Sequence, residues 1–167
     1  MKSLLTLIVS VLLITAGCAE SKSDPKMQSA DVPKVTVPNG HSPASDNAPH
    51  GGQNDGDDLR RNFNHGNGVL WVTLPKDGVI HAEVQKDGWL RIKYPWWRGV
   101  KGDLTVEGRR LDAPAPPMRT DVATSAQVGD IGINPGILMF PTEGYWEITG
   151  HVGNKSLTFV VKVVKET

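Results

Sequence analysis

Short stretches in which apolar and polar residues alternate recur along the chain from Val69 onward. In the run 79–84, for example, Ile80, Ala82 and Val84 share one face, which is the two-residue period of a half-buried strand. No stretch shows a convincing helical period. The pattern predicts strands over residues 69–74, 79–84, 89–94, 104–111, 136–140, 145–152 and 156–164.

Turn-forming residues separate these strands. Asp87-Gly88 suits a two-residue type I′ hairpin, and Gly153-Asn154 suits another. Seven strands in about 100 residues match the size and rhythm of an immunoglobulin-like sandwich, with a small barrel as the alternative. We therefore predict an all-β domain over residues 68–167, an immunoglobulin-like β-sandwich of about seven strands.

The amino-terminal residues follow a different pattern. Lys2 is followed by an unbroken apolar run from Leu4 to Ile14, and small residues then lead to Cys18. A run of this length is too short to span about 30 Å of hydrocarbon, so it predicts an export signal rather than a transmembrane helix. We predict a lipoprotein signal peptide over residues 1–17.

The sequence TAGC at residues 15–18 resembles the lipobox of bacterial lipoproteins, although Thr15 stands where Leu, Val or Ile is usual. The resemblance implies a lipidated Cys18, carrying diacylglyceryl and palmitate-type chains, at the extracytoplasmic face of the cell membrane. Two or more acyl chains give lasting attachment. Cys18 is the only cysteine, and lipidation would explain why an exported protein has a single thiol. The alternative is an ordinary signal peptide with Cys18 near its cleavage site.

Residues 18–67 are rich in Pro, Ser, Asn, Asp and Gly and contain few large apolar residues. Such a stretch does not bury enough surface to offset its ordering entropy. We therefore predict that it forms a disordered tether with a typical reach of about 40 Å. KVTV at 34–37 is its one short β-like island, and Phe63 is a candidate first contact with the domain.

Charge and motifs narrow the classes of function. The chain has 18 Lys and Arg and 18 Asp and Glu, so its formal charge is zero, and it has no basic block. This balance favours neither nucleic acid nor an anionic membrane surface as a partner. The sequence lacks G-x-S-x-G, H-E-x-x-H, C-x-x-C and phosphate-loop signatures. His81 and His151 lie near Glu83 and Glu147 without such a motif, so we predict a non-enzymatic protein with no cofactor.

Tryptophans supply the candidate binding residues. Successive side chains on a strand point to opposite faces, so only one of Trp96 and Trp97 belongs to the core. Parity favours Trp96 as that residue, while Trp71 and Trp146 are expected in the core or at its rim. Exposed aromatics stack on sugar rings or become buried in a partner. The predicted ligand face comprises Trp89, Arg91, Trp97 and Arg98. The alternative is that the Pro-rich crossing 112–119, or the tether around Phe63, covers this strip.

A second hypothesis is a copper- or zinc-binding lipoprotein. His41, His50 and His65 lie in the tether, near the acidic run 54–58. Their spacing sets no coordination geometry, and a flexible arm loses entropy when it closes around a metal. Polar linker is therefore the simpler interpretation of these residues.

Two longer resemblances support the fold and the location. PTEGYWEIT at 141–149 resembles the segment entering the penultimate strand of bacterial immunoglobulin-like domains, which would make Tyr145 a tyrosine-corner residue. The run from PWWRG to the final strand resembles a group of uncharacterised bacterial exported and lipoprotein sequences, in which Cys often replaces Tyr145. No activity follows from this likeness. We expect a lipid-anchored surface protein that binds an envelope component, such as a cell-wall glycan, or another exported protein.

Overall fold

The computed structural model describes residues 32–40 and 64–167, and this part of the chain is almost entirely β-structure. All seven predicted strands are present: β2 (Leu70–Thr73), β3 (Val79–Val84), β4 (Leu90–Lys93), β6 (Thr105–Arg110), β9 (Gly136–Phe140), β10 (Gly144–Val152) and β11 (Lys155–Lys165). The sequence pattern missed four short strands and one helical turn: β1 (Asn64–Gly66), β5 (Trp96–Arg98), β7 (Arg119–Val122), β8 (Gly132–Asn134) and α3 (Ser125–Val128).

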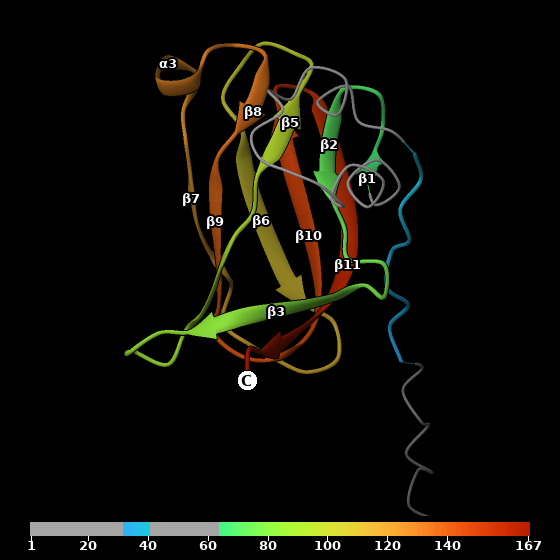
Figure 1. The fold of residues 1–167 in the computed structure, drawn as a ribbon, viewed down its shortest axis with the longest axis vertical. Helices are drawn as coiled ribbons and strands as arrows, with labels where there is room; N and C mark the ends of the chain where they lie inside the picture. Colours follow the sequence, from blue (N-terminus) through green and yellow to red (C-terminus); the bar gives the residue numbers. More distant parts are fainter. Residues whose placement is uncertain (1–31, 41–63) are drawn as a thin grey trace, which may run out of the picture. The chain divides into compact units, whose positions relative to one another are not determined.

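The strands form two sheets in a sandwich-like arrangement (Figure 1). One sheet has the order β1-β2-β5-β8, and the other has the order β6-β10-β11-β3-β4-β9-β7. Two chain segments contribute to both sheets, because β4 continues into β5 and β8 continues into β9. Pro95 and Pro135 lie at these two transitions, where a residue without an N–H interrupts the ladder.

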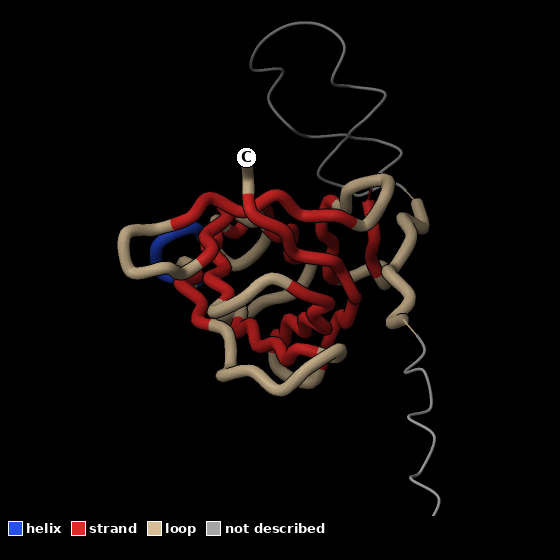
Figure 2. The backbone as a smooth tube through the Cα atoms, turned by 90° about the horizontal axis from the view of Figure 1, so that it is seen from below, coloured by secondary structure: helices blue, strands red, loops and turns tan. Residues whose placement is uncertain are grey.

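The seven-stranded sheet curls around the core, as the view from below shows (Figure 2). Its strand β3 pairs in parallel with β11 and antiparallel with β4. Its two outermost strands, β6 and β7, approach each other, and the Thr120 hydroxyl donates to the Val106 carbonyl at 3.2 Å. The sheet therefore surrounds its apolar side chains on most sides.

Aromatic side chains fill the core. Trp146 is completely buried and packs edge-on against Phe140, with ring centroids 5.3 Å apart. Trp96 packs against Phe159 at 5.7 Å, which confirms the expectation that Trp96 faces inward. A Cβ at Gly150 would lie 2.5 Å from the Trp96 ring, so the strand passing this ring requires glycine.

The folded part begins earlier than residue 68. The Thr36 N–H donates to the Val160 carbonyl, and the Val160 N–H donates to the Thr36 hydroxyl, both at 2.8 Å. The side-chain amide of Asn39 both donates to and accepts from the Gly66 backbone. The predicted disorder of the tether is therefore wrong for residues 32–40 and for β1. A bare strand edge is a liability, and residues 32–40, blue in Figure 1, lie beside this part of the β11 edge.

The two predicted hairpin turns have different outcomes. Val152 pairs with Lys155, so Gly153-Asn154 forms the expected two-residue turn, with a φ of 57° at Gly153. The turn at Asp87-Gly88 is longer. The Gly88 N–H donates to the Gln85 carbonyl at 2.9 Å, and the Gln85 N–H donates to the Trp89 carbonyl at 2.8 Å. These bonds enclose a three-residue loop with a left-handed Gly88, the geometry of a type I turn with a bulge.

Candidate ligand-binding face

The predicted ligand face divides, because Arg98 does not belong to it. Arg98 is fully buried and points to the side opposite Trp97. Its guanidinium donates to the Gly102 carbonyl and, at 2.6 Å, to the Gly129 carbonyl. The prediction that Arg98 lies on the outward ligand face is therefore wrong. Strand parity alone places Arg98 with Trp96 rather than with Trp97.

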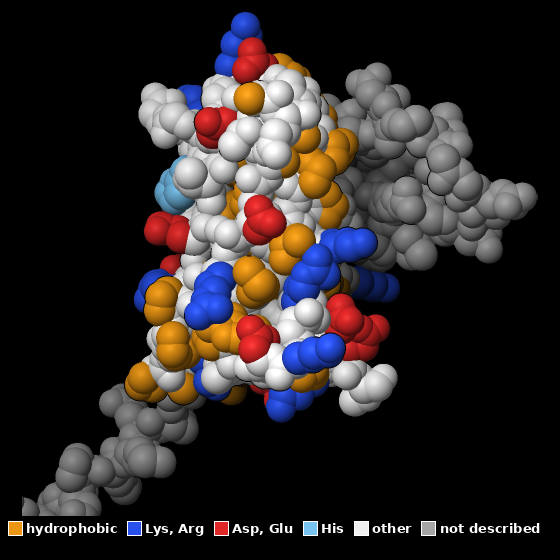
Figure 3. Space-filling model, turned by 90° about the vertical axis from the view of Figure 1, so that its left-hand side faces the viewer, with side chains coloured by type: hydrophobic (Ala, Val, Ile, Leu, Met, Phe, Trp, Pro, Cys, Tyr) orange, Lys and Arg blue, Asp and Glu red, His pale blue; other side chains and the backbone are white. Residues whose placement is uncertain are grey.

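The other three predicted residues lie on one outward surface. Register aligns Arg91 with Met139 and Arg119 across three strands, and it aligns Trp97 with Ile133. On these strands, the side chains that point to the same side as Arg91 and Trp97 are exposed or half-buried. The residues between them point into the core or are half-buried. We call this surface the ribbon face, comprising Trp89, Arg91, Lys93, Pro95, Trp97, Arg119, Asp121, Ile133, Pro135, Ile137 and Met139. Figure 3, which views the molecule from the side of β7 and β9, shows hydrophobic side chains among several Lys and Arg side chains.

Trp89 lies at one end of the ribbon face and has a partner within the chain. The guanidinium carbon of Arg119 lies 4.0 Å from the centroid of its ring, a cation–π contact. Arg119 is the last residue of the Pro-rich crossing, so for Trp89 the alternative of a covered aromatic is the one observed. One face of this ring is therefore not free to stack on a sugar.

Trp97 lies at the other end, beside Trp71 on the neighbouring strand. A Cβ at Gly99 would lie 2.6 Å from the Trp97 ring, and a Cβ at Gly66 would lie 2.0 Å from the Trp71 ring. Both indoles therefore rest directly on glycine backbone. Ile133, paired with Trp97, keeps 52% of its surface exposed. This end of the ribbon face is a half-buried apolar surface.

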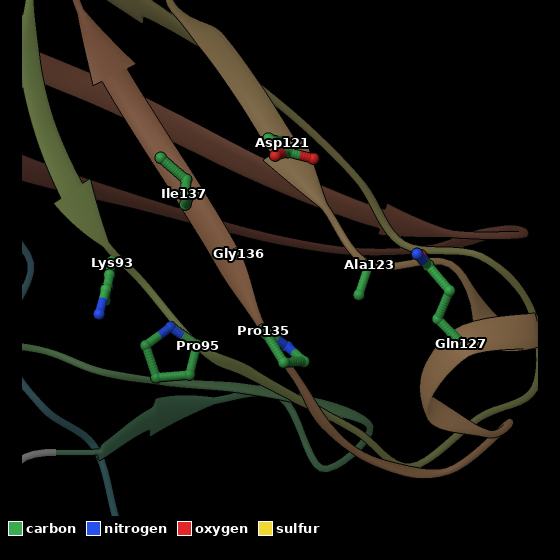
Figure 4. A pocket seen from close by; sticks show the side chains of 8 residues that line it. All are labelled: Lys93, Pro95, Asp121, Ala123, Gln127, Pro135, Gly136 and Ile137. Atoms are coloured by element: carbon green, nitrogen blue, oxygen red, sulfur yellow. The ribbon is translucent and has the colours of Figure 1, made fainter.

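A groove lies between the two ends. Its volume is about 490 Å³, within the range of small-ligand sites. It is lined by Lys93, Pro95, Asp121, Ala123, Gln127, Pro135, Gly136 and Ile137 (Figure 4). The strand breaks at Pro95 and Pro135 lie within it. The sequence contains both prolines but no sign that β7 and α3 would lie beside them, so the groove was not predicted.

The carboxyl groups whose pKa is lowered in the folded protein lie outside the groove. A hydrogen bond from the Arg110 guanidinium is the main cause of the lowered pKa of Asp112. Hydrogen bonds from the Ser125 hydroxyl and N–H lower the pKa of Asp103. These carboxylates fix loops and turns, and neither one lines the groove.

The histidines have separate environments. His41 and His50 lie outside the described residues. His65 lies on β1, its Nδ1 is buried without a hydrogen-bond partner in the described part of the chain, and burial is the main cause of its lowered pKa. His151 contacts Glu107 at 3.4 Å rather than Glu147, which pairs with Arg109. Across residues 32–40 and 64–167, no three His, Cys, Asp or Glu side chains are grouped to hold a metal.

Comparison with known proteins identifies no relative: no protein-family model and no curated protein matches this sequence. In the described ranges, no helix has the length and apolar character needed to cross a membrane.

Proposed function

We propose that this protein is a lipid-anchored, non-enzymatic protein of the extracytoplasmic membrane surface that binds an envelope component or another exported protein through the ribbon face. The observation that carries the binding proposal is the groove of about 490 Å³, which lies on the ribbon face between Trp97 at one end and Trp89 with Arg119 at the other. Concave sites with an apolar lining and a few polar groups are the usual form of small-ligand sites.

The strand order supports an immunoglobulin-like description of the domain. Constant-type immunoglobulin domains have strands in the order A-B-E-D in one sheet and C-F-G in the other. The order β3-β4-β9-β7 corresponds to A-B-E-D, and β6-β10-β11 corresponds to C-F-G. Strand β3 joins the two sets through its parallel pairing with β11. The smaller sheet is then an elaboration built on β2, β5 and β8.

The amino-terminal sequence supports the anchor. The apolar run 4–14 and the TAGC sequence ending at Cys18 are the features of a lipoprotein signal. Mass spectrometry of the protein from its native membrane tests this part directly. The expected species begins at Cys18 and carries the mass of acyl chains, and a free thiol on the native protein would reject the anchor.

Binding is tested with the full chain in detergent and purified envelope fragments. Ile133→Glu places a charge on the ribbon face at a side chain that is already 52% exposed, so the protein should keep its stability and lose envelope binding. Val84→Glu is the matched control, because Val84 is 49% exposed and does not belong to the ribbon face. Equal retention of wild type and both variants on envelope fragments would contradict the proposal.

A further inference from the structure

Two opposite charges flank the floor of the groove. Lys93 and Asp121 both pair in register with Ile137, one on each side (Figure 4). Two strand spacings separate their backbones, which is about 9.5 Å. A ligand lying across Ile137 therefore meets an ammonium at one end and a carboxylate at the other.

These charges have no ion-pair partner in the part of the chain that the structure describes. Among residues 32–40 and 64–167, neither Lys93 nor Asp121 takes part in an ion pair, although four other Lys or Arg side chains do. Both residues are exposed, so a ligand need not displace an internal contact to reach them. Gln127 adds a third polar group: its Oε1 accepts from Thr124, which leaves its Nε2 available to donate.

Backbone groups at the floor are already engaged, which excludes recognition by strand addition. The Tyr94 N–H donates to the Gly136 carbonyl, and the Ala123 N–H donates to the Pro135 carbonyl. Pro95 and Pro135 have no N–H to offer. Polar recognition in the groove therefore depends on the side chains of Lys93, Asp121 and Gln127.

The apolar lining indicates aliphatic contacts. Pro95, Pro135, Ile137 and Ala123 supply it, and none of the described residues that line the groove is aromatic. A sugar ring stacks best on an aromatic face, which is found only at the ends of the ribbon face. An anion alone would satisfy Lys93 and be repelled by Asp121. The chemistry that satisfies both charges is a zwitterion with small aliphatic groups between its ends.

We propose that the groove binds a short peptide with a free amino group, a free carboxylate and small aliphatic side chains. The carboxylate lies on Lys93, the ammonium lies on Asp121, and Gln127 donates to a carbonyl of the peptide. Three extended residues span about 10 Å, which matches the separation of the two backbone positions that carry these charges. This inference rests on the proposed function and names the ligand class for the middle of the ribbon face.

The test is calorimetric titration of the full chain in detergent with trialanine as the probe. Lys93→Glu and Asp121→Lys should each weaken binding about tenfold or more, because each replaces an attraction with a repulsion. The double variant Lys93→Asp with Asp121→Lys keeps one charge of each sign, so a zwitterion binds it in the reverse direction and affinity returns. Lys76→Glu, on an exposed turn, is the matched control and should bind like the wild type.

The outcomes separate this inference from the proposed function. N-acetylated trialanine amide, which lacks both charges, should bind at least about tenfold more weakly than trialanine. Equal binding of the capped and free peptides would overturn the inference, and so would failure of the double variant to recover binding. Envelope fragments retained by the protein in the absence of any trialanine binding would leave the proposed function standing and reject the peptide groove. Binding of neither probe would reject both.

Discussion

Arg98 provides the sharpest test of the division between core and ribbon face. Replacing it with methionine keeps much of the buried volume and removes the guanidinium. The two carbonyls that the guanidinium contacts, on Gly102 and Gly129, then lose their donors. The Arg98 Nε has no acceptor in the described residues, so these two contacts are the hydrogen bonds that the substitution removes.

The expected loss of stability follows from these contacts. A hydrogen bond from a charged donor contributes about 1.5–3 kcal/mol, so two such bonds contribute roughly 3–6 kcal/mol. Part of this loss is offset because the variant no longer has to bury the charge of Arg98 away from water. The carbonyl of Gly129, an exposed residue, can also be hydrated by solvent. We expect Arg98→Met to lower the free energy of unfolding by about 2–3 kcal/mol, which corresponds to about 10 °C or more in Tm.

Urea denaturation followed by tryptophan fluorescence measures this change. Arg91→Met is the matched control, because Arg91 is half-buried on the ribbon face and has no ion pair in the described chain. That variant should stay within about 0.5 kcal/mol of the wild type. An Arg98→Met protein as stable as the Arg91→Met protein would show that the guanidinium contacts do not hold the two loops. The assignment of Arg98 to the core would then fail.

Three further changes probe the early part of the folded chain. Asn39→Ala removes two hydrogen bonds to Gly66 and should cost about 1–2 kcal/mol, with faster amide exchange at Gly66; unchanged exchange would show that residues 32–40 are not held there. Gly66→Ala places a methyl group 2.0 Å from the Trp71 ring and should cost about 1–3 kcal/mol with a changed near-ultraviolet circular dichroism spectrum, and an unaltered spectrum would argue against this contact. The pKa of His65 is lowered in the folded state, so the unfolded chain binds more protons below the ordinary value of 6.5, and stability should fall as the pH falls through that value. His65→Gln should reduce this loss between pH 7.5 and 5.5, and an equal loss in wild type and variant would assign the pH dependence to other groups.

The fold was predictable where burial imposed a regular period. Strand β3 carries alternating apolar residues, and the final strand repeats the pattern through Leu157, Phe159 and Val161, all buried. The short strands β5 and β8 have only three residues each, too few for a period to be read. Strand β5 exists because it pairs with β2, and β8 because it pairs with β5, and no local pattern encodes these long-range contacts.

The site was predictable only in part, for a related reason. Parity correctly placed Trp89, Arg91 and Trp97 on the outward surface, and the same rule applied to Arg98 would have excluded it. The charge of Arg98 argued for exposure, but two loop carbonyls satisfy it inside the protein. One of these carbonyls belongs to Gly129, 31 residues away in sequence, so this compensation is visible only in three dimensions. The groove depends in the same way on β7 and α3.

Docking of residues 32–40 also changes how far the domain can stand from the lipid that we propose on Cys18. With the whole of 18–67 as a spacer, an extended chain would allow well over 100 Å. The attachment of Thr36 and Asn39 to the sheet leaves at most about 18 residues before the first fixed contact, an upper limit of about 60 Å. Releasing both contacts, as in a variant that combines Thr36→Pro with Asn39→Ala, would lengthen the available spacer without altering the ribbon face. If the ligand is fixed in a layer at a set height above the membrane, binding on intact cells should respond to this variant while trialanine binding in detergent does not.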